Sequence, residues 1–158
     1  MKEWLRILLS GQPHFTIGGK ENPYMLRWYV IPRNRQLNIY VHKFLRDDDD
    51  RALHDHPWWF ISLILKGGYT EIVPSPDGLG NIAVARNWLS LAFHRATHRH
   101  RVVLRYRNGI RPVPAWTLVV TGRKHRTWGF WCPKGFVPWH EFVDQNDSGN
   151  VGRGCGEA

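Results

Sequence analysis

The sequence predicts an all-β fold, either a closed barrel or two packed sheets, and three observations support this prediction. From Tyr24 onward, apolar and polar residues alternate over short stretches, which is the period expected of strands. Gly, Pro and Asn residues interrupt these stretches at intervals of roughly 8 to 12 residues. No long segment between them has a helical period, which argues against a parallel sheet with crossover helices.

Residues 1–20 are expected to form a short helix and a linker. One apolar helical face is formed by Trp4, Leu5, Leu8 and Leu9. Gly11 and Pro13 then end the helix, because glycine favours helix C-termini and proline cannot continue a helix.

Residues 21–143 are assigned to one β-domain with nine extended segments. The first, 24–33, is closed by Pro32, and the second, 37–45, alternates regularly. The others span residues 60–73, 82–86, 89–97, 100–107, 115–122, 127–132 and 139–143. Turn signals lie at Asn34, Gly67-Gly68, residues 74–80, Asn108-Gly109, Gly122 and residues 133–135. Residues 144–158 are rich in Gly, Asn and Asp, so we expect a loose, flexible tail.

Composition restricts the possible classes of protein. The chain has 158 residues, of which 42% are hydrophobic and 13% aromatic, as expected of one globular domain. Its longest nearly apolar stretch, 58–65, is far shorter than the roughly 20 residues of a transmembrane helix. Glu3 and Arg6 interrupt the N-terminal leucines, so we expect neither a signal peptide nor a membrane partner.

The positive charge is concentrated in one part of the chain. Residues 78–140 hold eleven of the 22 Lys and Arg residues and none of the 13 acidic residues, so this segment carries +11 and the rest −2. Such a field attracts an anionic partner, which could be nucleic acid, a phosphorylated metabolite or a carboxylate. A solvated basic surface without a dedicated ligand is the alternative. The acidic run 47–50 lacks the ligand spacing of a calcium loop, and we interpret it as a solvated loop.

The two cysteines, Cys132 and Cys155, are too few for a disulfide framework and do not have zinc-finger spacing. We interpret both as reduced thiols in a cytoplasmic protein, since disulfides are rare in that compartment. Neither shows the electropositive, accessible setting of a catalytic thiol strongly enough to be assigned that role.

Nine histidines form the most informative pattern of the sequence. His54 and His56 lie two residues apart before an apolar strand, so in an extended chain both rings point to the same side. Two imidazoles placed this way make half of a transition-metal site. The alternative interpretation is that these histidines are structural and that their ring nitrogens form hydrogen bonds within the fold.

A distant strand can complete this site. In the segment 98–104 the even positions share one face with apolar residues, and the arginines at odd positions belong on the outer side. His100 is the preferred third ligand and His98 the second choice. Glu71 follows the Gly67-Gly68 turn, and it is a candidate fourth ligand or hydrogen-bond partner of a histidine. Surface or supporting positions are expected for His14, His42, His94, His125 and His140.

Three segments together resemble the two metal motifs of the cupin superfamily, particularly small cupin-like proteins of bacteria and phages. They are 53–58 (LHDHPW), 62–71 (SLILKGGYTE) and 100–102 (HRV). The resemblance covers residues 40–142. It implies a single-domain cupin, a double-stranded β-helix or jelly-roll barrel, that holds a metal inside its mouth and that pairs through edge strands as a homodimer.

Carried over by position, His54 and His56 match the paired histidines of the first motif, and His100 matches the histidine of the second. The family's usual glutamate would fall near Phe60 or Ile61, and neither side chain binds a metal. The pattern therefore resembles the three-histidine variant of thiol-dioxygenase cupins. The second motif lacks its usual proline and glycine, which keeps His98 as an alternative to His100.

Three neutral imidazoles leave open metal positions for substrate, water or dioxygen. Iron(II) is the expected cofactor, and nickel, manganese or zinc would fit the same ligands. The predicted lumen is aromatic and excludes water, with Tyr40, Trp58, Phe60 and Tyr106 on its wall. A guanidinium near the metal would bind an anionic substrate, and the candidates are Arg51, Arg95 and Arg123.

Three functions are compatible with these features. The first is a metal-dependent cupin enzyme, an iron(II) oxygenase such as a dioxygenase, that acts on a small polar or anionic molecule. The second is a cupin that binds a nucleotide, sugar nucleotide or signalling molecule without turnover. The third is a nucleic-acid-binding or nucleic-acid-modifying protein that uses the outer arginines, although the sequence contains no recognised nucleic-acid motif.

Overall fold

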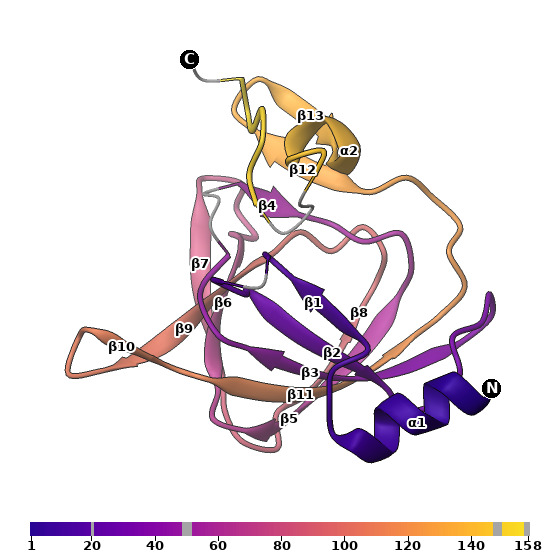
Figure 1. The fold of residues 1–158 in the computed structure, drawn as a ribbon. Coiled ribbons are helices and arrows are strands. Elements are labelled where there is room, and N and C mark those ends of the chain that lie inside the picture. Colours follow the sequence, from indigo (N-terminus) through magenta and orange to yellow (C-terminus); the bar gives the residue numbers. More distant parts are fainter. Residues whose placement is uncertain (20, 49–51, 147–149, 157–158) are drawn as a thin grey trace.

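A computed structural model describes residues 1–19, 21–48, 52–146 and 150–156, and it is all-β with two short helices (Figure 1). The helices are α1 (Lys2–Ser10) and α2 (Trp139–Phe142). The first strands are β1 (Phe15–Ile17), β2 (Met25–Tyr29), β3 (Asn38–Phe44), β4 (Leu53–His54), β5 (Phe60–Lys66), β6 (Tyr69–Pro74) and β7 (Asn81–Arg86). The remaining strands are β8 (Leu91–His94), β9 (Arg101–Arg107), β10 (Arg111–Val113), β11 (Ala115–Thr121), β12 (Gly129–Cys132) and β13 (Gly135–Pro138).

The strands form three antiparallel sheets. A six-stranded sheet has the order β1-β2-β3-β11-β5-β8, and a four-stranded sheet has the order β10-β9-β6-β7. A core cluster that includes Ile64, Tyr69, Val102, Leu104 and Ala115 lies between these two sheets. The third sheet, β13-β12-β4, lies with α2 at the end of the molecule away from α1 (Figure 1). The fold is therefore a two-sheet barrel with a cap of C-terminal residues.

The central strands bury alternate residues, as the period of two predicts. In β11 the buried row contains Ala115, Thr117, Val119 and Thr121, and in the neighbouring strand β3 it contains Asn38, Tyr40 and His42. Because a strand sends alternate side chains to opposite faces, these rows point into the barrel. Several inward residues are polar, which predicts a ligand cavity rather than a solid apolar core.

The Gly67-Gly68 turn joins β5 to β6 in a way that only glycine permits. Both residues have positive φ angles, 74° and 150°. A Cβ atom on Gly67 would lie 2.6 Å from the Pro114 carbonyl oxygen, and one on Gly68 would lie 2.5 Å from the Arg86 carbonyl oxygen. The turn therefore depends on left-handed backbone and close contact with neighbouring strands. It brings Glu71, on the following strand, to the inner face of the barrel, where it is 1% exposed.

The prediction of a strand at residues 139–143 is wrong, because residues 139–142 form the helix α2. Phe142 is buried and stacks on Phe130 with ring centroids 3.7 Å apart. Five residues are too few for periodicity to distinguish a strand from one helical turn. The preceding residues 135–138, partly assigned to a turn, form β13 instead. In the described ranges, neither helix has the length and apolar character needed to cross a bilayer.

The interpretation of the cysteines as free thiols is also wrong, because Cys132 and Cys155 form a disulfide. Their Cα atoms are 5.5 Å apart, which the sequence separation of 23 residues did not reveal. The bond attaches residues 150–156 of the expected loose tail to the third sheet. The same segment donates hydrogen bonds from the Gly152 and Gly154 amides to the Phe142 carbonyl oxygen.

Part of the acidic run 47–50 differs from the solvated loop that we predicted. Asp48 accepts a hydrogen bond from the Val102 amide at 2.7 Å, and Asp47 accepts one from the Leu104 amide at 2.6 Å. The two carboxylates thus satisfy backbone donors of β9 that no strand in the described part of the chain pairs. Residues 49 and 50 lie outside the described part of the chain.

Candidate metal centre and its cavity

Backbone pairing brings the two histidine motifs together. His54 ends β4, and its amide donates to the His100 carbonyl oxygen at 2.9 Å, while the His100 amide donates back to His54 at the same distance. On its other side, β4 pairs with Phe130 of β12. His56 follows two residues after His54 and its amide bonds to the Ala96 carbonyl oxygen. Two motifs that are far apart in the chain therefore share one small region.

Asp55, between the two histidines, fixes the shape of this segment. It is fully buried, and its carboxylate accepts hydrogen bonds from the Gly129 amide at 3.0 Å and from Arg126 at 2.7 Å. Arg126 also donates to the carbonyl oxygens of His56 and Ala96. A buried carboxylate paired in this way holds the backbone on both sides of it in place. The Asp of the His-Asp-His motif thus positions its neighbours.

The rings of His54, His56 and His100 face one another. One ligand nitrogen from each lies within 4.8 Å of the other two, and the Nε2 atoms of His56 and His100 are 2.8 Å apart. Burial lowers the pKa of His54 to about 4 and the pKa of His56 well below its ordinary value. Burial thus favours the neutral form of His54 and His56, which is the form that binds a metal cation. Both the geometry and the donor set fit a divalent transition metal with three imidazole ligands.

Glu71 supports His100 from behind. Its Oε1 atom accepts a hydrogen bond from His100 Nδ1 at 2.7 Å, and its Oε2 atom is 2.6 Å from Arg86. Burial alone would raise the pKa of Glu71, but hydrogen bonds from His100 and His98 hold the pKa well below its usual range. With the Nδ1 proton directed at Glu71, the Nε2 lone pair of His100 faces His56 and is available to a metal.

The second-choice ligand, His98, lies on the far side of Glu71. Its Nε2 atom is 3.0 Å from Glu71 Oε1, and the ligand atoms of His98, Glu71 and His100 also lie within 4.8 Å of one another. Arg86 already forms an ion pair with Glu71. The group of His98, Glu71 and His100 therefore gains less from a bound metal ion than the three histidines do. His94 is buried nearby, with its Nδ1 atom 3.8 Å from Glu71 Oε1. His98 and His94 thus both lie beside the carboxylate that accepts the His100 Nδ1 hydrogen bond.

Aromatic rings surround the three histidines. The ring centroid of Phe60 is 4.6 Å from that of His56, and Trp128 lies nearly parallel to the His56 ring. Phe60 occupies one of the two positions where the resemblance would place a carboxylate, so the structure shows an apolar contact there. The rings exclude water from one side of the candidate centre.

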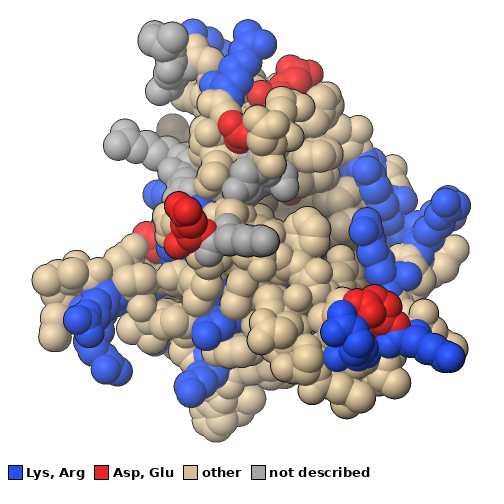
Figure 2. All heavy atoms as spheres, in the orientation of Figure 1, with Lys and Arg blue, Asp and Glu red and all other residues tan. Residues whose placement is uncertain are grey.

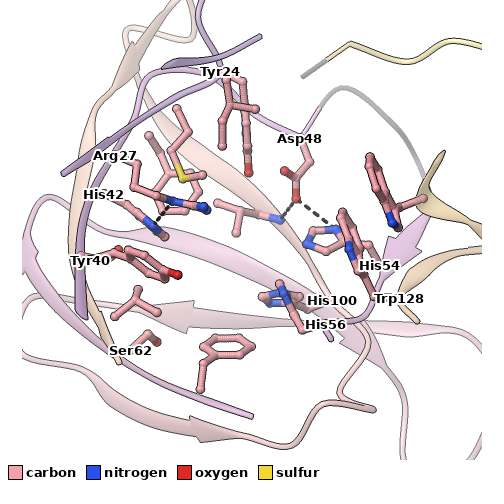
Figure 3. A pocket seen from close by; sticks show the side chains of 18 of the residues that line it. Tyr24, Arg27, Tyr40, His42, Asp48, His54, His56, Ser62, His100 and Trp128 are labelled. Atoms are coloured by element: carbon pink, nitrogen blue, oxygen red, sulfur yellow. Dashed lines mark hydrogen bonds and ion pairs between the residues drawn. The ribbon is translucent and has the colours of Figure 1, made fainter. Parts of the chain in front are cut away.

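The histidines border a cavity of about 360 Å³ inside the barrel (Figure 3). This is within the size range of small-molecule sites, about 300–1,000 Å³. Tyr40 and Trp58 line the cavity, in agreement with the predicted lumen. Tyr106 is outside the lining; it is 44% exposed and its hydroxyl donates to Asp47. The residue lies near the end of β9, beyond the part of the strand that faces the core.

The predicted guanidinium positions do not coincide with the cavity. Arg95 and Arg123 are exposed and absent from the described cavity wall, because they lie in turns that point to solvent. Arg51 lies outside the described residues. The arginine that does line the cavity is Arg27 on β2, together with His42 on β3. The alternation of Met25, Arg27 and Tyr29 could have indicated an inward arginine, but both faces of this strand contain apolar residues.

Known structures have the same fold at low sequence identity. No protein-family profile matches the sequence, and no curated protein is significantly similar to it. The crystal structure of FeII HppE aligns with a TM-score of 0.53 at 16% identity, and FeII HppE in complex with substrate (form 2) gives 0.53 at 15%. Each alignment covers 71% of this chain and 57% of HppE.

This chain therefore spans a little over half the length of HppE. An uncharacterised double-stranded β-helix protein from Klebsiella pneumoniae aligns at a TM-score of 0.49 and 12% identity, over 73% of this chain and 90% of that one. Identities this low concern the fold and not the reaction. The sheet order, the inward rows and the similarity to HppE give the chain an all-β, cupin-like barrel fold.

Proposed function

We propose that the chain is a metal-dependent enzyme in which His54, His56 and His100 hold one divalent first-row metal ion, with iron(II) as the leading candidate. The observation that carries the proposal is the meeting of three imidazole ring nitrogens at the edge of an internal cavity. Nickel, manganese and zinc suit the same ligands. The fold similarity to FeII HppE is consistent with iron and leaves the reaction to experiment.

The proposed reaction class is oxygenation of a small polar or anionic molecule. Iron(II) with three protein ligands supplies positions at which substrate and dioxygen can bind together. The chain's own residues prepare the site for this. Glu71 holds the His100 proton at Nδ1, and Phe60 and Trp128 exclude water on the histidine side.

Metal content tests the first step of the proposal. The protein is reconstituted with Fe²⁺ without oxygen, desalted and analysed for metal, alongside the His54→Ala/His56→Ala variant. We expect about one equivalent in the wild type and less than a tenth in the variant. The His125→Ala/His140→Ala variant is the matched control, because both of these histidines are exposed. Metal-free wild type after reconstitution, or equal loading of all three proteins, would contradict the proposal.

A cupin that binds its ligand without turnover is the alternative, and oxygen uptake separates the two. The iron-loaded protein is incubated with a panel of small acids in an oxygen-electrode cell. Uptake that depends on both the acid and the iron supports the enzyme. Thermal stabilisation by an acid without oxygen uptake supports the binding protein.

A further inference from the structure

The wall of the cavity includes a positively charged side chain, Arg27, that is not part of the candidate metal centre. Arg27 extends from β2 toward the interior, on the wall across from His54, His56 and His100 (Figure 3). Its Nε atom donates a hydrogen bond to His42 Nε2 at 2.9 Å. The guanidinium carbon lies 4.7 Å from the centre of the Tyr40 ring. Two neighbours on β3 therefore fix the direction of the guanidinium.

No carboxylate among the described residues forms an ion pair with Arg27. Two of the other half-buried arginines, Arg86 and Arg126, differ from it in this respect. Arg86 is 2.6 Å from Glu71, and Arg126 is 2.7 Å from Asp55, and both of these carboxylates are 1% exposed. An arginine that serves only the fold is expected to be neutralised in the same way, because burying an unpaired charge is costly.

The partner of Arg27 is neutral and leaves its charge available. Burial, followed by the positive charge of Arg27, holds the pKa of His42 well below its ordinary value. The ring thus accepts the Nε hydrogen bond without cancelling the charge. Within the described part of the chain, the Nη1 and Nη2 hydrogens have no acceptor, and these atoms are the pair that binds a carboxylate or phosphonate in a bidentate manner.

A second polar group on the cavity wall is also without a partner. Thr117 on β11 lies opposite His42 in the β3–β11 pairing and is 1% exposed. Thr117 is one of the residues that line the cavity, and its buried Oγ1 atom makes no hydrogen bond to any described residue. Buried hydroxyl groups in proteins nearly always have a partner. A buried hydroxyl without a hydrogen bond, on the same sheet as a guanidinium whose Nη hydrogens have no acceptor among the described residues, points to a polar ligand that would bond to both.

We propose that Arg27 binds the oxyanion of a small organic acid, a carboxylate or a phosphonate, whose apolar body fills the cavity. Thr117 donates a further hydrogen bond to the ligand, and Met25, Phe60 and Val119 contact its apolar part. The acid thus lies between Arg27 and the three histidines. Only the statement that this acid is the substrate rests on the proposed function, since anion binding itself requires no metal.

Ligand binding to chelator-treated and to as-purified protein tests the proposal. Phenylacetate and phenylphosphonate are the anionic probes, and phenylacetamide is the neutral control of matched shape. Calorimetry and thermal shift are expected to show at least tenfold tighter binding of one acid than of the amide. Arg27→Gln is expected to remove that preference, while Arg107→Gln, at an exposed position, keeps it. Equal affinity for acids and amide in the wild type, or an unchanged preference in Arg27→Gln, would overturn it.

Two further variants distinguish a loss of ligand binding from misfolding of the protein. Arg27→Lys keeps the charge and loses the planar fork, and we expect about tenfold weaker binding of the preferred acid. Thr117→Val removes the unpaired hydroxyl, so we expect weaker acid binding in a protein that melts no lower than the wild type. A chain that binds acids but no metal would refute the proposed enzyme and leave this inference standing. A chain that binds metal but no acid would do the reverse.

Discussion

The two ring nitrogens of His100 face different partners, and at the scale of single residues this assigns one nitrogen to a supporting hydrogen bond and leaves the other for a metal. Nδ1 faces Glu71 at 2.7 Å and Nε2 faces His56 at 2.8 Å. A carboxylate behind a ligand histidine fixes the tautomer and raises the basicity of the ring. The choice between His98 and His100, open at the level of sequence, depends on this geometry, because only His100 belongs to the group with His54 and His56.

His42 gives a pH dependence that belongs to one residue. Burial lowers its folded-state pKa far below 6.5, whereas the unfolded chain keeps the ordinary value. Above pH 6.5 the ring is neutral in both states and contributes nothing. As the pH falls below 6.5, the unfolded state binds a proton that the folded state does not, and stability is lost.

We therefore predict that His42→Gln loses about 2 kcal/mol less stability than the wild type between pH 7.5 and pH 5. The amide oxygen of glutamine can still accept the Arg27 hydrogen bond and does not titrate. Urea unfolding at the two pH values measures the difference. An identical loss in wild type and variant would show that His42 is not the titrating group.

At the scale of elements, strands of regular alternation could be predicted and short irregular segments could not. The rows of buried side chains on β3, β5 and β11 could be predicted from the sequence, because burial of one face of a strand imposes a period of two. The helix α2 was missed because Phe142 packs on Phe130, a contact that four residues of sequence do not contain. The disulfide was missed for the same reason, since only the fold brings Cys132 and Cys155 together.

The disulfide stabilises the C-terminal elements, which gives a second prediction. Cys155→Ser is expected to lower the free energy of unfolding by about 3 kcal/mol, because the bond closes a loop of 23 residues. Thermal unfolding of the oxidised wild type, the reduced wild type and the variant measures this. The reduced wild type and the variant should melt at the same lower temperature. Two reactive thiols in the native, non-reduced protein would contradict the prediction.

At the scale of the whole molecule, the acid-free segment 78–140 is less available to a polyanion than its charge suggests. Arg86 and Arg126 are paired with internal carboxylates, and Arg99 lies over the Trp131 ring. On the face drawn in Figure 2, Lys and Arg form several separate groups with acidic residues between them. Binding of a nucleic-acid backbone requires a continuous row of cations.

We predict that a 25-base-pair duplex shows weak association with this protein at low salt and none near 150 mM salt, because few contacts release few counterions. Fluorescence anisotropy over a salt series measures this. A complex that persists at 150 mM salt would support a nucleic-acid function instead.

The site could be predicted from the sequence only in part, and the reason is again spatial. His54 and His56 are two residues apart in the sequence, so an extended chain at this point is enough to predict that their rings converge. The guanidinium of the cavity did not follow, because proximity to a turn favoured Arg95 and Arg123 over Arg27. Both faces of β2 are partly apolar, so the sequence does not show which face points inward. The inward position of Arg27 follows only from the packing of β2 in the barrel.

The covalent link between Cys132 and Cys155 has a practical consequence for any assay. It closes a ring of chain that contains Val151, one of the residues on the cavity wall. Dithiothreitol, commonly added to keep ferrous proteins from oxidising, would open this ring while it protects the iron. Ligand affinities measured with and without such a reductant therefore refer to two covalent forms of the protein, which differ in how the chain around Val151 is tethered to β12.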